Sequence, residues 1–156
     1  MSRFRCVPMP TETAMRFRAT MRDDAGNAII RRTVTEPGSP CRHCLRDGAV
    51  GEEMLLGSYD LLGPRGIYWT PSPIFVHAHD CERYDQADHL AEIVRRRLVS
   101  VRAYDADQLC LYDLGHVADG AEIDEALDRA ISDPRTDFVN IHTAKPGCLL
   151  CRVERA

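Results

Sequence analysis

Two short segments of the chain carry side chains that bind soft metal ions. The first is Cys41-Arg42-His43-Cys44, and the second is His77-Ala78-His79-Asp80-Cys81. Two thiols separated by two residues can bind one ion from a tight turn, and a second thiol–imidazole pair completes the tetrahedral ligand set that zinc prefers. The predicted ligands are Cys41, Cys44, His77 and Cys81, with His79 as the alternative to His77.

The number of protein ligands decides what such a zinc ion does. Four ligands close the site, so no water is activated and the metal braces the fold. Three ligands leave an open position for hydrolytic chemistry. Four strong ligands in one spacing pattern favour the closed, structural site. The alternative interpretation is a pair of buried free thiols and a solvent-facing histidine pair, because strand alternation puts His77 and His79 on one face.

A further Cys-x-x-Cys motif, Cys148 to Cys151, has the spacing of disulfide oxidoreductases. In those enzymes the pair opens a helix, whose dipole lowers the thiol pKa. Here the sequence around it is typical of a strand, on which residues three apart face opposite sides. We therefore expect two packed thiols and no redox pair, and Cys6 and Cys110 are expected to be core thiols without a partner.

Polar residues of three predicted strands form a second candidate site. Asn140 and His142 share one strand face, and Arg102 shares another with Tyr104. If those strands are neighbours, the polar groups converge near the last strand and could form a small anion or acid site. The alternative is a surface ladder of cross-strand pairs. The candidate residues of this site are Arg102, His142, Cys148 and Arg152.

Composition limits the class of protein. The length of 156 residues, with 44% hydrophobic and 28% charged residues, fits one globular domain over 1–156. The net charge of −4 gives no attraction to nucleic acid, and the basic run Arg95–Arg97 is short and has no aromatic stacking platform. No apolar run approaches a membrane span, and no secretory segment is visible. We therefore expect a cytoplasmic protein with reduced thiols that binds neither nucleic acid nor membrane.

Hydrophobic periodicity predicts an α+β fold with a mostly antiparallel sheet and about three helices. Thr11 is the expected N-cap of the first helix, and Asp119 that of the last. The irregular stretch 61–73 is a candidate lid or rim. The expected helices are 11–22, a short one within 90–97, and 121–132, and the expected strands are 4–7, 29–35, 53–59, 74–77, 98–104, 109–117, 138–142 and 149–153.

Several phrases together resemble a known family. They are Pro73-Ile74-Phe75-Val76, Arg102-Ala103-Tyr104-Asp105 and the ending 146–155, with Pro40-Cys41-Arg42 and Gly51-Glu52-Glu53. From about Pro40 onward the chain resembles the bacterial family called domain of unknown function 1203 (DUF1203). The resemblance implies a small bacterial cytoplasmic domain and no particular substrate. Some members share the phrase containing His77 and Cys81, which favours His77 over His79, and others lack these ligands, which implies a structural metal confined to a subgroup.

Two hypotheses about function follow. The first is a zinc-braced binding or interaction domain without catalysis, whose partner is an unknown small molecule or protein. The alternative is a small enzyme that uses Arg102, His142 and Cys148 on the sheet. A buried metal with four protein ligands favours the first, and a deep pocket containing His142 favours the second.

Overall fold

The computed structural model describes residues 3–156, which form two compact units. The chain passes from one unit to the other after Val7, Leu62, Trp69 and Tyr84. Unit 1 holds the segment ending at Val7 together with Gly63–Trp69 and Asp85–Ala156, and unit 2 holds Pro8–Leu62 and Thr70–Tyr84. Because both units are interleaved along the chain, the assignment of 1–156 to one domain stays a prediction.

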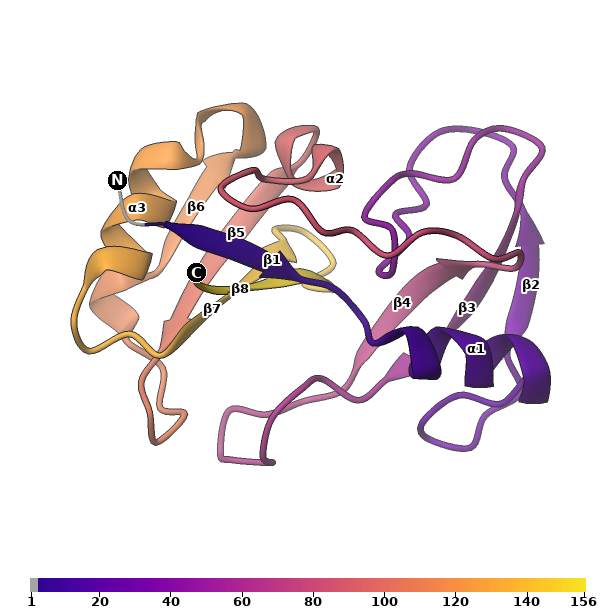
Figure 1. The fold of residues 1–156 in the computed structure, drawn as a ribbon, viewed down its shortest axis with the longest axis horizontal. Coiled ribbons are helices and arrows are strands. Elements are labelled where there is room, and N and C mark those ends of the chain that lie inside the picture. Colours follow the sequence, from indigo (N-terminus) through magenta and orange to yellow (C-terminus); the bar gives the residue numbers. More distant parts are fainter. Residues whose placement is uncertain (1–2) are drawn as a thin grey trace. The chain divides into compact units, whose positions relative to one another are not determined.

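Unit 1 is built on a five-stranded sheet with the order β1-β8-β7-β5-β6, in which every neighbouring pair is antiparallel (Figure 1). The first and last strands of the chain pair with each other, Phe4 opposite Arg155. A β-bulge interrupts the pairing of β7 with β8 at Ile141 and His142. The strands are β1 (Phe4–Val7), β5 (Leu98–Tyr104), β6 (His116–Asp119), β7 (Phe138–Thr143) and β8 (Leu149–Arg155).

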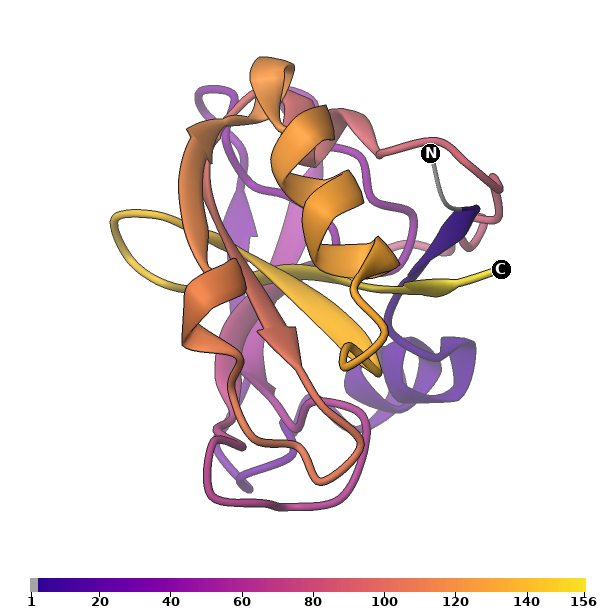
Figure 2. The same cartoon turned by 90° about the vertical axis from the view of Figure 1, so that its left-hand side faces the viewer.

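Strand alternation gives this sheet one apolar and one partly polar face. In β5 the side chains of Val99, Val101 and Ala103 are fully buried, whereas Ser100 and Arg102 on the other face are half-buried. Helix α3 (Asp124–Ser132) contacts β5 and β7 and lies across the sheet in Figure 2. Its apolar side chains recur at helical spacing, so they face the sheet while the charged ones face solvent.

Two tight turns and a short helix complete unit 1. Helix α2 (Glu92–Arg95) is one turn long, and the 3-10 turns are η1 (Tyr112–Leu114) and η2 (Gly120–Glu122). Gly120 is required where η2 meets the end of α2, because a Cβ atom there would lie 1.8 Å from the carbonyl oxygen of Val94.

Unit 2 combines the antiparallel sheet β2-β3-β4 with helix α1 (Thr11–Thr20). Its strands are β2 (Ile30–Thr33), β3 (Glu53–Tyr59) and β4 (Ser72–His77). Ala14 and Phe17 of α1 are fully buried. The buried carboxylate of Asp23 then organises the turn before β2, since it accepts hydrogen bonds from the backbone of Ala25, Asn27 and Ser58. The bond from Ser58 ties that turn to β3.

The predicted α+β class with antiparallel strands is confirmed, and the strands divide between two sheets. Three local predictions were wrong. Asp119 caps the 3-10 turn η2 instead of α3: its carboxylate accepts from the N–H of Ala121, and α3 begins only at Asp124. Thr11 does not cap α1, because its hydroxyl instead contacts Nε2 of His43 at 2.9 Å, and Pro10 occupies the N-cap position. The strand expected at 109–117 begins only at His116, because the carboxylate of Asp105 accepts from two backbone N–H groups and holds the chain in a turn.

No helix formed by the described residues is long and apolar enough to cross a membrane.

Candidate metal centre

The first cysteine pair lies on a tight turn of unit 2 that is tied to β4. The backbone N–H of Leu45 donates to the carbonyl of Cys41 at 3.0 Å, and that of Cys41 donates to Arg46 at 2.9 Å. Cys41 also forms a parallel bridge with Phe75. Leu45 has a φ of 55° although it is fully buried, so the turn uses the left-handed region that usually favours glycine. This turn aims both thiols at the end of β4.

The second ligand pair follows directly from β4. His77 is its last residue, and Cys81 belongs to the irregular segment that follows. The backbone N–H of Tyr84 donates to the carbonyl of His43 at 3.1 Å, so this segment is held against the cysteine turn. Backbone contacts on both sides therefore position the two segments.

The structure brings Cys41, Cys44, His77 and Cys81 together. One ligand atom from each, three Sγ atoms and one imidazole nitrogen, lie within 4.8 Å of one another. The Sγ atoms of Cys41 and Cys81 are 3.9 Å apart, and Sγ of Cys44 is 3.5 Å from Nδ1 of His77. Cys41, Cys44 and His77 are buried, and Cys81 is half-buried. This buried Cys/His cluster could hold a metal ion.

The thiols and the imidazole of this cluster have pKa values shifted in different directions. Hydrogen bonds from Cys41 and Cys81 lower the pKa of the Cys44 thiol far below its ordinary value. Hydrogen bonds with Cys41 and Cys44 raise the pKa of His77 to about 10. The same two thiols raise the pKa of Cys81, with burial acting in the same direction. Cys44 is therefore the thiol most ready to act as an anionic ligand.

His79, the alternative ligand, lies outside the thiol cluster. Its exposed ring contacts the Glu52 carboxylate through Nε2 at 2.7 Å and the carbonyl of Asp80 through Nδ1 at 2.8 Å. His77 directs its Nε2 toward the same carboxylate at 3.4 Å. Among the described residues His79 is thus grouped with Glu52 and His77, and it is His77 that lies with the three cysteines.

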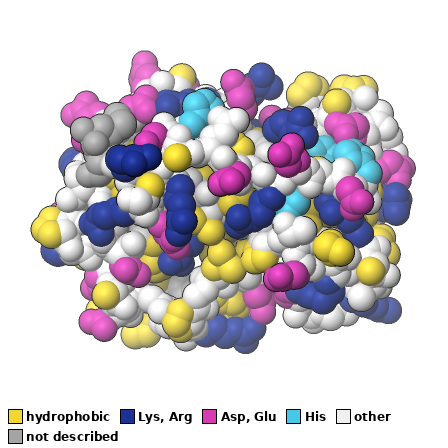
Figure 3. Space-filling view, in the orientation of Figure 1, with side chains coloured by type: hydrophobic (Ala, Val, Ile, Leu, Met, Phe, Trp, Pro, Cys, Tyr) yellow, Lys and Arg dark blue, Asp and Glu magenta, His cyan; other side chains and the backbone are white. Residues whose placement is uncertain are grey.

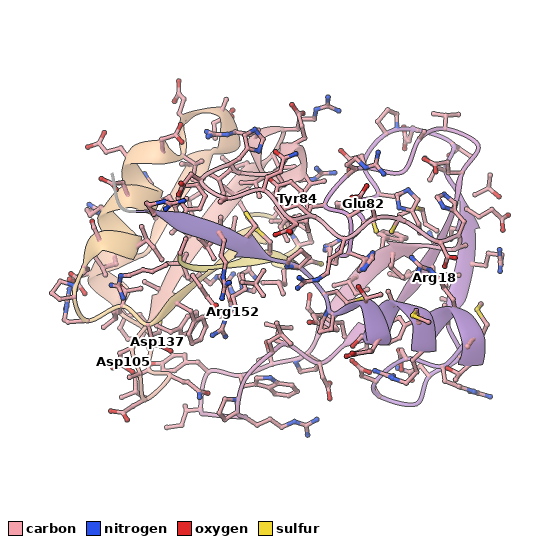
Figure 4. The ribbon with its side chains drawn as sticks, in the orientation of Figure 1. Arg18, Glu82, Tyr84, Asp105, Asp137 and Arg152 are labelled. Carbon is pink, nitrogen blue, oxygen red and sulfur yellow. The ribbon has the colours of Figure 1, made fainter. Side chains whose placement is uncertain are left out.

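Three neighbours of the sulfur atoms were not predicted from the sequence. Nδ1 of the buried His43 is 3.1 Å from Sγ of Cys81, and burial, followed by the charge of Arg18, lowers the pKa of His43. Arg18 donates to Sγ of Cys81 at 3.4 Å and to the carbonyl of His77 at 3.0 Å, reaching them from α1 (Figure 4). A hydrogen bond with Cys44 raises the pKa of Arg46. The position of His43 between Cys41 and Cys44 is a sequence signal from which its place beside the sulfur atoms could have been predicted. Arg18 and Arg46 lie in no motif, so the sequence gives no such signal for them.

The second candidate set lies in unit 1 and is only partly assembled. Register pairs Arg102 with Asn140 and Asn140 with Arg152, so these three share one face. Nδ1 of the buried His142 donates to the carbonyl of Gly147 at 2.9 Å. Cys148 lies in the turn before β8, where its backbone N–H donates to the Thr143 hydroxyl. Within residues 3–156 the Cys148 thiol makes no side-chain hydrogen bond, so it is not joined to the arginine row.

Comparison with known proteins places the chain in a family. A family model described as "Protein of unknown function (DUF1203)" matches residues 38–155, which include all four residues of the Cys/His cluster. No curated protein and no solved structure matches the chain.

Proposed function

This chain belongs to the DUF1203 family, and we propose that it binds one zinc ion that braces unit 2 of a non-catalytic binding or interaction domain. The observation that carries the proposal is the set of four ligand atoms within 4.8 Å of one another. Two segments, separated by 33 positions between Cys44 and His77, supply three thiols and an imidazole, and no disulfide joins the thiols. Thiolates and imidazoles are the ligands of structural zinc.

Two ligand–ligand distances within the cluster match those of a zinc tetrahedron. Zinc lies about 2.3 Å from sulfur and about 2.0 Å from nitrogen, so tetrahedral ligands are about 3.8 Å apart for two sulfurs and about 3.5 Å for sulfur and nitrogen. The corresponding distances here are 3.9 Å between Cys41 and Cys81 and 3.5 Å between Cys44 and His77. A disulfide would need two sulfurs about 2.05 Å apart. The spacing therefore suits a shared ion better than a covalent bridge.

The charges around the cluster support the same metal. Three thiolates and one neutral imidazole around a divalent ion leave one net negative charge. Guanidinium groups offset it, because Arg18 contacts Cys81 and Arg46 contacts Cys44. Hard cations such as Mg²⁺ and Ca²⁺ prefer oxygen ligands, whereas zinc accepts sulfur and nitrogen.

A structural role follows from the number of ligands. Four protein ligands fill the tetrahedron, so no position is left for a reacting water. The ion would join the turn after Pro40 to the end of β4, and metal binding and folding would be linked. All seven cysteines are free, and zinc–thiolate ligation needs reduced thiols, which supports a cytoplasmic location.

Elemental mass spectrometry on protein purified without chelator tests the proposal. We expect about one zinc per chain in the wild type, and clearly less zinc and lower stability in Cys44→Ser. Cys110→Ser is the matched control, since Cys110 is a half-buried thiol of unit 1 and lies outside the cluster. Metal-free wild type that is as stable as zinc-loaded protein would rule the proposal out.

A further inference from the structure

The polar face of the sheet of unit 1 carries a row of three side chains. Arg102 on β5 lies opposite Asn140 on β7, and Asn140 lies opposite Arg152 on β8. Directly opposed residues of neighbouring strands project to the same face, and neighbouring strands are about 4.8 Å apart. The two arginines therefore start on either side of Asn140, within reach of one small group placed above it.

Asn140 is the unusual member of this row. It is only 8% exposed, yet in the part of the chain that the structure describes its side-chain amide makes no hydrogen bond. Within the described residues, the Asn140 amide is not among the fully buried side-chain atoms that lack a partner, so it is still reached by solvent. Asn140 thus offers two N–H donors and one acceptor to a group that approaches this face.

The two arginines differ in how much of their charge is used. The Arg152 guanidinium donates through Nε to Glu154 at 2.7 Å and lies 3.9 Å from the ring centre of Phe138. Arg102 donates through Nε to the Ser100 hydroxyl at 3.3 Å and also hydrogen-bonds with the Tyr104 hydroxyl, and the ion pairs formed within residues 3–156 do not include it. Glu154 also pairs with Arg5 of β1, so three arginines and one glutamate leave two net positive charges on this face, which suits an anion.

Aromatic side chains border the same row. The rings of Tyr104 and Phe138 stack with centres 5.0 Å apart, and Tyr68 meets Tyr104 edge-on at 6.3 Å. The segment Gly63–Trp69 brings Tyr68 to this face, and a Cβ on Gly63 would lie 3.6 Å from Nη1 of Arg152. Apolar surroundings strengthen charge-assisted hydrogen bonds, because they reduce the screening by water. Arg152 can be followed in Figure 4, where it extends from β8.

From the Arg102–Asn140–Arg152 row we infer that unit 1 binds the oxyanion group, a carboxylate or a phosphate, of a small molecule. The guanidinium of Arg102 supplies a planar pair of donors that matches such a group, and the Asn140 amide supplies a further donor at the base of the site. The terminal nitrogens of Arg152 close the other side. This inference does not rest on the zinc site, which lies in unit 2.

Titration of the full-length chain with inorganic phosphate and, separately, with acetate tests the inference by calorimetry. We expect one saturable site for at least one of the two anions, and the anion that binds identifies the preferred group. Arg102→Gln should weaken binding by about tenfold or more, because it removes charge-assisted hydrogen bonds. Arg96→Gln is the control, since Arg96 is an exposed arginine that pairs with Glu92 on α2 and should keep wild-type affinity.

A second measurement uses the wild type alone, so it does not depend on whether a variant folds. In nitrogen-15 NMR spectra, the side-chain amide of Asn140 and the Nε–H of Arg102 should shift with the same dissociation constant as the calorimetric site. The inference is overturned if neither anion binds, if Arg102→Gln and Arg96→Gln bind equally well, or if the shifts map to other residues. A loss of zinc would leave this result unchanged and would bear only on unit 2.

Discussion

The Sγ atom of Cys44 lies 3.5 Å from Nδ1 of His77, although the two residues are 33 positions apart in the sequence. The other nitrogen of the same ring, Nε2, faces the carboxylate of Glu52 at 3.4 Å. Metal-binding histidines commonly donate their second N–H to a carboxylate, which fixes the orientation of the ring. Glu52 is itself held by the backbone N–H of Ala49 at 2.7 Å. The His77 ring is therefore held with Nδ1 toward the three thiols.

His77→Ala and His79→Ala should differ in metal content. His77→Ala removes one of four clustered ligand atoms, so we expect a marked loss of bound zinc per chain. His79→Ala should retain about the wild-type amount, because the exposed His79 ring contacts Glu52 rather than a thiol. Elemental analysis with a chromogenic chelator competition measures both. Equal zinc retention in the two variants would contradict the assignment.

At position 45, glycine should destabilise the protein less than alanine does, which is the reverse of the order expected for a leucine in a helix interior. Leu45→Ala and Leu45→Gly both lose buried apolar contacts, at a cost of a few kcal/mol. Alanine keeps the strain of the left-handed φ of 55°, whereas glycine relieves it. We expect the glycine variant to be about 1 kcal/mol more stable than the alanine variant in urea unfolding.

The matched control for Leu45 is Leu127, which is buried within α3. There the glycine variant should be about 1 kcal/mol less stable than the alanine variant, as in any helix interior. If glycine is also worse than alanine at position 45, the backbone of the cysteine turn does not carry this strain.

Asp23 should make the stability of the protein depend on pH. Burial raises its pKa, but the hydrogen bonds from Ser58 and Asn27 outweigh burial, so the folded pKa is lowered. A lowered carboxylate pKa stabilises the fold above the unfolded value of about 3.9, and this contribution is lost as the pH falls through the folded pKa. We expect Asp23→Asn to cost about 3 kcal/mol at neutral pH, because four hydrogen bonds to the charged form are weakened or lost.

Urea unfolding at pH 7 and at pH 3 measures this difference for Asp23→Asn against the wild type. The difference in the free energy of unfolding between the two proteins should become smaller at pH 3. Asp107→Asn serves as the control, because Asp107 is an exposed carboxylate on a turn of unit 1 and should change stability little at either pH. A gap that stays constant with pH would show that charge on Asp23 is not the cause.

Cys148 and Cys151 should not form a reversible disulfide. Cys151 is 2% exposed on β8 and hydrogen-bonds with Cys6, which lowers the pKa of Cys6, whereas Cys148 lies in the turn before the strand. Alkylation of the folded protein should therefore label Cys148 far faster than Cys6 or Cys151. Mass spectrometry after incubation along a glutathione gradient checks both points. A Cys148–Cys151 bond forming near the cytosolic potential would refute this expectation.

Most strands and the long amphipathic helix could be predicted from the sequence, because alternation and helical periodicity are local signals. Strands β3 and β5 begin and end where the pattern predicts. The division into two sheets could not be predicted, because pairs such as Phe4 with Arg155 join distant parts of the chain. Periodicity indicates which face of a strand is apolar, and it says nothing about which strand lies beside it.

The candidate metal centre shows the same limit. The spacing of two residues grouped Cys41 with Cys44. The separation of four residues at the end of a strand grouped His77 with Cys81. The contact of Arg18 with Cys81 spans 63 positions and depends on how α1 packs, so no motif contains it. Figure 3 shows basic and acidic side chains intermingled over one face of the molecule. Surface charge therefore does not distinguish Arg18, which contacts Cys81, from other arginines.

The interleaving of the two units has a consequence for how the protein is made on the ribosome. Every segment of unit 2 has been synthesised once Tyr84 has emerged, so the Cys/His cluster can assemble while most of unit 1 is still being translated. Strand β1 emerges before all of unit 2, but its partner β8 emerges last. Phe4–Val7 must therefore wait, unpaired, until Arg155 is available. If the cluster binds zinc as proposed, the ion would be needed before the larger sheet closes, and a shortage of zinc would leave the nascent chain with neither unit complete.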